Sequence, residues 1–298
     1  MGKFLKNKYF MLLSTISITL ALLFFVNINK TSSILVINPL PENTTLDING
    51  DGIQDSILIS SSTTEFTVNN KEYSLNSIMN DNNFSSSSPS WPTKIFAHKI
   101  PRSPKPVLII QSNKNNIGKV SVISLDNELF NIIYSEEKNI FGILDTKGSR
   151  TPKYYSLKSS SGNSSLNSFM ILDNKLLDIT NDTTRIPGID DLLVFIDLIQ
   201  ADYDPSDLPS LFHEDISKDD LSLLWTLDKD NYNYSFQDAF FCDDEINNKG
   251  SITSIKWRLT FEKYNKGSDD SNKKEKILYL TTKITDDNSY KISSISFN

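Results

Sequence analysis

The segment FMILDNKLLDI (Phe169–Ile179) carries the pattern on which the fold prediction depends. Apolar residues flank the two-residue turn Asp173-Asn174, and Asp and Asn tolerate the positive φ angles of a tight hairpin turn. Two other segments share this pattern: EFTVNNKEYSL (Glu65–Leu75), with the turn Asn69-Asn70, and VISLDNELFNI (Val122–Ile132), with the turn Asp126-Asn127. The three segments predict three β-hairpins.

A further pair of strands is predicted upstream of each hairpin, which gives a repeated unit of four antiparallel strands. The second and third turns are separated by about 47 residues, the size of one blade of a propeller. We therefore predict all-β, blade-like antiparallel repeats over residues 41–182, forming a partial propeller. An ordinary β-sandwich with coincidental turns is the alternative.

The segment LDINGDGIQD (Leu46–Asp55) is the sharpest chemical motif in the chain. Oxygen-bearing side chains recur at alternate positions, Gly52 permits a sharp turn, and hard oxygen ligands at this spacing suit Ca²⁺. Carboxylates packed this closely repel one another unless a cation neutralises them. The predicted ligands are the side chains of Asp47, Asn49, Asp51 and Asp55 and the carbonyl of Ile53. A turn rich in Asp and Asn without a metal is the alternative.

An apolar strand, residues 56–60, follows this loop directly. An EF-hand is disfavoured, because its closing acid would fall at Leu58. The loop and strand together resemble the FG-GAP/VCBS repeat of integrin-type propellers and bacterial surface proteins. That resemblance implies Ca²⁺ ligation by the four side chains named above, and a structural role for the ion. The corresponding segments Leu144–Lys153 and Ile100–Ser103 have lost the ligands, so we expect no metal there.

After residues 181–188, apolar residues no longer recur at the two-residue spacing of strands. They recur at the three- to four-residue spacing of a helix. Leu192, Phe195 and Ile196 mark an amphipathic helix that begins near Gly188, and four alternating strands follow. Residues 188–298 therefore predict an α+β domain with a curved antiparallel sheet. This order of elements resembles the nuclear-transport-factor-2-like (SnoaL-like) cone, which implies a pocket that is catalytic in some members and only binds in others.

The N-terminal segment predicts a transmembrane helix. Residues 1–8 carry three Lys and no acid, and Tyr9–Val26 contains no charge. A helix of that length spans about 27 Å, close to the ~30 Å hydrocarbon core of a membrane. We expect a cytoplasmic tail (1–8), an anchor (9–26) and a linker (27–40), with residues 31–298 outside the cell. A cleaved signal peptide is the alternative, although no small-x-small site follows the apolar run.

Composition narrows the function. The net charge is −7, and because residues 1–30 contain four Lys and no acid, the remainder is still more acidic, which argues against nucleic acid as a partner. There are two histidines and no recognisable nucleophile motif. We predict a non-catalytic binding or envelope-assembly module whose partner is a cell-envelope protein or glycan. The alternative is an enzyme that uses a C-terminal pocket with His213 or Asp228; a pocket filled by Phe and Trp would favour the first hypothesis.

Overall fold

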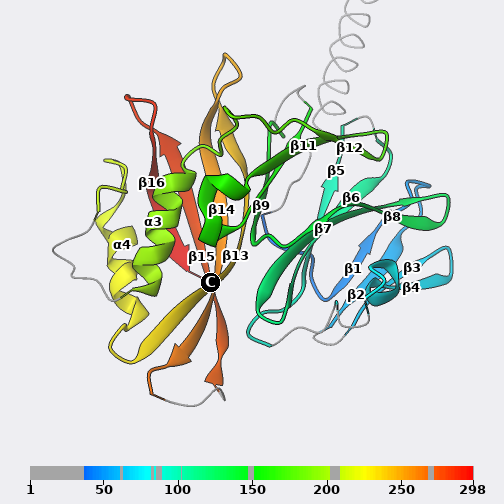
Figure 1. Cartoon of the computed structure of the whole chain (residues 1–298), viewed down its shortest axis with the longest axis horizontal. Helices are drawn as coiled ribbons and strands as arrows, with labels where there is room; N and C mark the ends of the chain where they lie inside the picture. Colours follow the sequence, from blue (N-terminus) through cyan, green and yellow to red (C-terminus); the bar gives the residue numbers. More distant parts are fainter. Residues whose placement is uncertain are drawn as a thin grey trace, which may run out of the picture. The chain divides into compact units, whose positions relative to one another are not determined.

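The computed structural model describes residues 37–297, except 61–62, 82–83, 85–88, 102, 147–150, 202–208 and 268–271. Strands make up 51% and helices 14% of the described residues, so this part of the chain is mostly β. The strands form two four-stranded sheets and one eight-stranded sheet. Figure 1 shows the eight-stranded sheet and its helices beside the two smaller sheets.

The two smaller sheets are antiparallel meanders in which each strand pairs with the next along the chain. The first sheet contains β1 (Asn43–Leu46), β2 (Asp55–Ile59), β3 (Thr64–Val68) and β4 (Lys71–Ser74), followed by the short helix α2 (Leu75–Ile78). The second contains β5 (Lys94–Lys99), β6 (Pro106–Lys114), β7 (Ile117–Asp126) and β8 (Leu129–Glu136).

The third sheet combines two groups of strands in the order β12-β11-β10-β9-β13-β14-β15-β16. The first group is β9 (Ile140–Leu144), β10 (Lys153–Leu157), β11 (Asn167–Leu172) and β12 (Lys175–Asp178), with the 3₁₀ segment η1 (Ser159–Ser165) between β10 and β11. The second group is β13 (Tyr232–Ile246), β14 (Ile252–Asn265), β15 (Lys274–Ile284) and β16 (Tyr290–Phe297).

The three predicted hairpins are confirmed, and their turn residues have the expected positive φ angles. Asn69 and Asn70 have φ of 50° and 62°, and Asp173 and Asn174 have φ of 50° and 59°. The second turn lies one residue later than predicted, at Asn127 and Glu128. Asp126 remains the last residue of β7, where its carboxylate accepts a 2.6 Å hydrogen bond from Lys105 Nζ.

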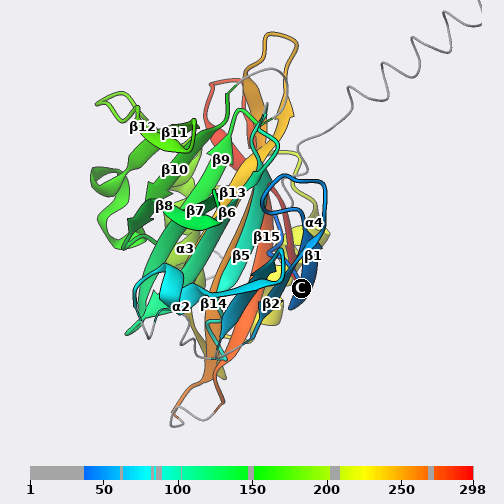
Figure 2. The same cartoon turned by 90° about the vertical axis from the view of Figure 1, so that its right-hand side faces the viewer.

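The two groups in the third sheet are joined by a parallel pair of strands. β9 pairs with β13 over four residues, Ile140–Ile143 against Ala239–Cys242. Figure 2 shows these strands side by side, and all other strand pairs described here are antiparallel. The third meander and the C-terminal strands are therefore one continuous sheet.

The expected fold class is consequently wrong. The third repeat is not a separate blade of a partial propeller, and the C-terminal strands do not form the sheet of an independent α+β domain. Spacing along the sequence could not reveal the β9–β13 pair, because these strands are about a hundred residues apart and are buried on both faces.

The predicted transmembrane helix is not supported either. In the part of the chain that the structure describes, no helix is long and apolar enough to cross a membrane. Residues 9–26, on which that prediction rests, lie outside the described residues, as do the tail 1–8 and most of the linker.

Strand β6 of the second sheet is buried on both faces, which explains why it is apolar at successive positions rather than at alternate ones. Neighbouring residues along its strands point into two different cores. Ile95, Leu108 and Ile110 belong to the core shared with the first sheet, and Phe96, Val107 and Ile109 belong to the core shared with the third sheet.

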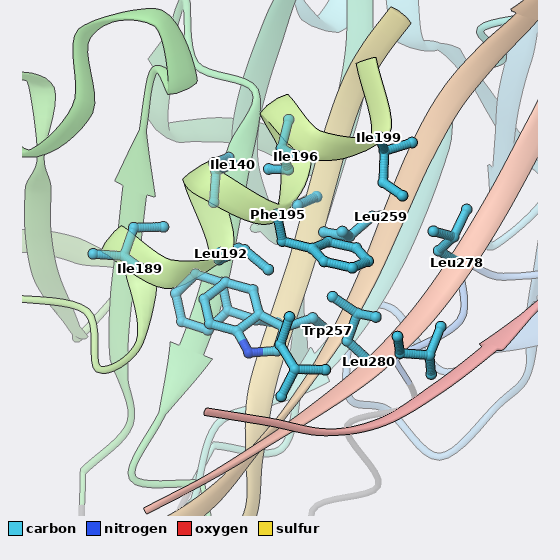
Figure 3. Packing of buried hydrophobic residues seen from close by; sticks show 14 of the residues in the cluster. Ile140, Ile189, Leu192, Phe195, Ile196, Ile199, Trp257, Leu259, Leu278 and Leu280 are labelled. Atoms are coloured by element: carbon cyan, nitrogen blue, oxygen red, sulfur yellow. The ribbon is translucent and has the colours of Figure 1, made fainter. Parts of the chain in front are cut away.

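A helix covers one face of the C-terminal strands. The predicted helix near Gly188 is confirmed as α3 (Ile189–Gln200), and the short helices α4 (Lys218–Ser222) and η3 (Leu223–Leu227) follow. Figure 3 shows Phe195 of α3 pointing toward Trp257, Leu259 and Leu278 of the sheet. All four side chains are fully buried, and they belong to the largest of the three hydrophobic cores that the described residues form.

The β9–β13 pair requires a glycine at position 142. Gly142 lies opposite Phe241 in the register, and a Cβ added at Gly142 would lie 2.3 Å from atoms of the Phe241 ring. That ring also packs against Trp257, with the ring centroids 4.5 Å apart. Because Gly142 has no side chain, the Phe241 ring can pack against β9 at this position.

We predict that Gly142→Ala lowers the free energy of unfolding by about 1–3 kcal/mol, because the methyl group overpacks the Phe241 ring. Chemical denaturation of Gly142→Ala, Phe241→Leu and the double variant measures this. The double variant should lose less stability than the sum of the single variants, since the smaller side chain relieves the clash. Additive losses would contradict the proposed contact.

Candidate functional site

The acidic loop connects β1 to β2 and is shaped by its own side chains. Asp47 accepts hydrogen bonds from the backbone N–H groups of Gly50 (2.6 Å), Asp51 (3.1 Å) and Gly52 (2.9 Å). Gly50 and Gly52 have φ of 79° and 87°, which only glycine adopts easily. The spacing of small and acidic residues in this segment therefore produces a tightly wound loop.

The remaining predicted ligands are distributed around this loop. Asp51 accepts hydrogen bonds from Ile53 N (2.7 Å) and Asn49 Nδ2 (2.7 Å), and the exposed side chain of Ile53 points to solvent. Asp55 is buried and accepts a bond of 2.8 Å from the N–H of Ile48. Among the described residues, no three His, Cys, Asp or Glu side chains are arranged as a metal-binding group.

The electrostatics of the loop favour a cation. Burial raises the pKa of Asp55 above its usual value, and the charges of Asp51 and Asp47 raise it further. The N–H of Ile53 and the amide of Asn49 lower the pKa of Asp51. A carboxylate offers about four lone-pair positions, and none of these three carboxylates fills all of them with the hydrogen bonds described. The donor set therefore fits a hard cation such as Ca²⁺.

The two residues considered for catalysis have structural contacts. His213 Nδ1 accepts a 3.1 Å hydrogen bond from the N–H of Asp215, and its imidazole lines a shallow depression beside Lys283. Asp228 has φ of 50°, and its carboxylate accepts bonds of 3.0 and 3.1 Å from the amide of Asn231. Asp228 thus shapes the turn that leads into β13.

A separate polar cleft of about 350 Å³ lies where β13 passes the beginning of β9. It falls within the range of roughly 300–1,000 Å³ that is usual for small-molecule sites. The lining includes two half-buried aromatic rings, two amides, a lysine and a glycine: Trp91, Phe236, Asn139, Gln237, Lys158 and Gly118.

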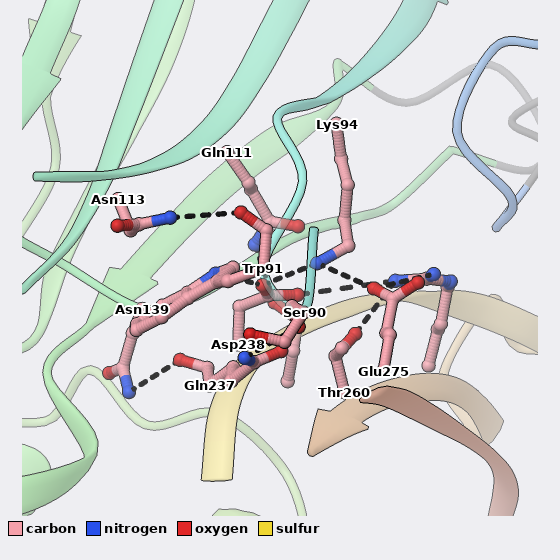
Figure 4. Close-up of polar contacts among 12 residues, drawn as sticks. Ser90, Trp91, Lys94, Gln111, Asn113, Asn139, Gln237, Asp238, Thr260 and Glu275 are labelled. Carbon is pink, nitrogen blue, oxygen red and sulfur yellow. Dashed lines mark hydrogen bonds and ion pairs between the residues drawn. The ribbon is translucent and has the colours of Figure 1, made fainter. Parts of the chain in front are cut away.

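The amides of this cleft are held in place. Asn139 donates to Ser159 Oγ (2.9 Å) and to the carbonyl of Gln237 (3.2 Å), and it accepts from the N–H of Ser159. Gln237 Nε2 donates to the carbonyl of Ser90 (2.7 Å). Trp91 Nε1 donates to Asp238 (2.8 Å). Figure 4 shows Trp91 between these amides and a group of charged side chains.

A β-bulge places Gln237 in this position. The pairing of β13 with β14 shifts between Phe236 and Asp238, so Gln237 has no direct partner on β14. Bulges change the direction of a side chain and are common beside functional sites. Gln237 is 2% exposed, and its Oε1 atom accepts no hydrogen bond from the described residues.

The charged group behind Trp91 has equal numbers of positive and negative side chains, of which Lys94, Asp238 and Arg258 are buried and Glu275 is half-buried. Lys94 of β5 lies 2.7 Å from Asp238 of β13 and 3.1 Å from Glu275 of β15. Arg258 of β14 lies 4.0 Å from Asp238 and 3.8 Å from Glu275, and it donates to Thr260 (2.9 Å). Two cations and two anions thus connect the second sheet to the third.

No protein-family model and no curated protein matches the sequence of this chain. The acidic loop was predicted from its spacing, whereas the cleft and the charged cluster were not. Their residues come from segments far apart in sequence. One signal was available: Lys94, Asp238 and Arg258 each stand next to or within a strongly apolar strand, where a charge is rarely buried without a partner.

We predict that Lys94→Met lowers the free energy of unfolding by about 3–5 kcal/mol, because it leaves a buried excess of negative charge. Lys94→Met combined with Asp238→Asn should recover part of this loss by restoring the balance. The matched control is Lys71→Met, which removes the exposed Lys71–Glu128 pair at 3.8 Å and should cost less than about 1 kcal/mol. Equal losses in urea denaturation for the two lysine variants would refute the prediction.

Proposed function

We propose that this chain is a non-catalytic binding module that acts outside the cytoplasm, with a cell-envelope protein or glycan as its partner. The observation that carries this proposal is the filled face of the C-terminal strands. The face of these strands beneath α3 is filled by the fully buried side chains of Phe195, Trp257, Leu259 and Leu280.

The contacts of the two candidate catalytic residues support the same function. A general acid or base must reach a reacting group within hydrogen-bonding distance. The imidazole of His213 is bonded to its own chain, and Asp228 is bonded within its turn. Both residues therefore have sufficient structural roles.

Action outside the cytoplasm remains a prediction from residues 1–30. The basic residues and the uncharged segment that follows are typical of exported chains. The proposed partner, a cell-envelope protein or glycan, also depends on this location, because these are the large ligands available outside the cytoplasm.

The test is cosedimentation of the purified full chain with isolated cell-envelope material, together with mass spectrometry of the supernatant. We expect saturable binding and no product that increases with time. His213→Ala and Asp228→Asn should bind as the wild type does. A released product whose formation depends on either residue would replace this function with the enzymatic alternative.

The acidic loop is proposed to hold one structural Ca²⁺ through Asp47, Asn49, Asp51 and Asp55, with the carbonyl of Ile53. Its resemblance to the FG-GAP/VCBS loop and the raised pKa of Asp55 support this assignment. Asp55 is the first residue of β2 and pairs with Leu46 of β1, so neutralising the loop stabilises the start of that hairpin.

We predict that millimolar Ca²⁺ raises the melting temperature by about 1–5 °C relative to EDTA. This corresponds to about 0.4–1.4 kcal/mol for a Kd of about 10⁻⁴–10⁻³ M, the range of extracellular modules. Asp51→Ala should lose most of the increase. Asp230→Ala, which removes an exposed carboxylate outside the loop, is the matched control and should keep it. An equal response of all three proteins would exclude the loop as the site.

A further inference from the structure

The side chains that line the polar cleft beside Trp91 are held in fixed positions by their neighbours. Gly118 at the start of β7 approaches Asn139 so closely that an added Cβ would lie 2.7 Å from Asn139 Cβ. Asn139 is in turn fixed by Ser159 and Gln237. Side chains fixed before binding reduce the entropic cost of holding a ligand.

The lining combines aromatic surface with hydrogen-bonding groups. Trp91 and Phe236 are each half-buried, so both present part of an apolar ring to the cleft. Gln237 carries a buried acceptor, Oε1, that has no donor among the described residues. A buried acceptor without a donor is unfavourable by about 1–3 kcal/mol, which a hydroxyl group of a ligand that donates to Oε1 would offset.

The charges of the cleft do not suit an anionic ligand. Lys273 lies 3.3 Å from Glu262, and Lys138 donates to the carbonyl of Ser165. Lys158 and Glu137 line the cleft without an ion pair to another described residue, and their charges are opposite. A phosphate or a nucleic acid would require several uncommitted cations, so a neutral polar ligand fits better.

The backbone of the cleft does not suit a peptide strand. An extended peptide binds by pairing with an open sheet edge. β13 has such an edge before Ala239, where its pairing with β9 begins. Gln200 Oε1 accepts from the N–H of Phe236 (2.8 Å), and Asn139 donates to the carbonyl of Gln237. Side chains therefore already occupy two of the hydrogen-bonding positions that a peptide strand paired with this edge would need.

We infer that this cleft binds a short neutral segment of a glycan. Sugar rings have apolar C–H faces that pack on aromatic rings and hydroxyl groups that bond to amides and carboxylates. The cleft supplies the rings through Trp91 and Phe236 and the polar groups through Gln237 and Glu137. This inference rests on the proposed binding function and names the class of ligand.

The experiment measures binding of neutral tetrasaccharides of glucose and of N-acetylglucosamine to the full chain, by calorimetry and by tryptophan emission. The emission reports location, because Trp257 is fully buried, Trp225 is exposed on η3, and Trp91 lines the cleft. At least one tetrasaccharide should bind saturably and change the emission. Trp91→Phe should abolish the emission change, and the control Trp225→Phe should keep both the change and the affinity.

Two further variants test the cleft itself. Phe236→Ala should weaken binding at least tenfold. Ser160→Leu adds bulk at an exposed lining position that makes no described hydrogen bond, and it should weaken binding similarly without unfolding the chain. Melting curves confirm that each variant is folded. Binding that stays within threefold in both folded variants, or no binding of any tetrasaccharide, overturns the inference.

A set of short uncharged peptides in the same assay separates the possible failures. A peptide that binds in the cleft when the tetrasaccharides do not would overturn the glycan class and leave the binding function intact. Hydrolysis of a bound tetrasaccharide would support the ligand class and overturn the non-catalytic function.

Discussion

The parallel pairing of β9 with β13 is the interaction on which the rest of the structure depends. It joins strands about a hundred residues apart and converts a four-stranded meander and a four-stranded C-terminal sheet into one sheet. Gly142 makes this possible, because the Phe241 ring occupies the space of its missing side chain. The pair also links two cores, since Phe240 belongs to the core shared with the second sheet and Phe241 to the core beneath α3.

The end of that pair explains the cleft. β13 continues for seven residues before Ala239 without β9 beside it, so its backbone groups need other partners there. Asn139 and Gln200 supply them, and the bulge at Gln237 occurs in this stretch. The neighbouring Asp238 is buried against Lys94 and Trp91. The preorganised polar surface is thus a consequence of where the parallel pairing begins.

Local features could be predicted from the sequence, and long-range pairing could not. Adjacent Asn and Asp residues located two hairpin turns, and the apolar period after Gly188 located α3, because both signals depend only on neighbours in the chain. The spacing of the acids predicted a loop directly before the strand that the structure shows as β2. The order of strands in the third sheet depends instead on β9 and β13. Both are buried and apolar, and the apolar pattern of such a strand does not indicate which strand it pairs with. The charged cluster also forms only when distant strands pair. The sequence therefore shows its residues as single charges in apolar segments and not as a group.

The acidic loop and the charged cluster each bring several charged side chains close together, and their charges are compensated in different ways. In the cluster, Asp238 and Glu275 lie beside Lys94 and Arg258, so the buried charges balance within the chain. In the loop, backbone N–H groups and one amide stabilise the carboxylates, and none of the hydrogen bonds described brings a cationic side chain to them. Partial dipoles offset charge less completely than a full opposite charge does. Burial is the main reason that the pKa of Asp55 is raised, and the neighbouring charges of Asp51 and Asp47 raise it further, with no cationic side chain in the hydrogen bonds described to oppose them.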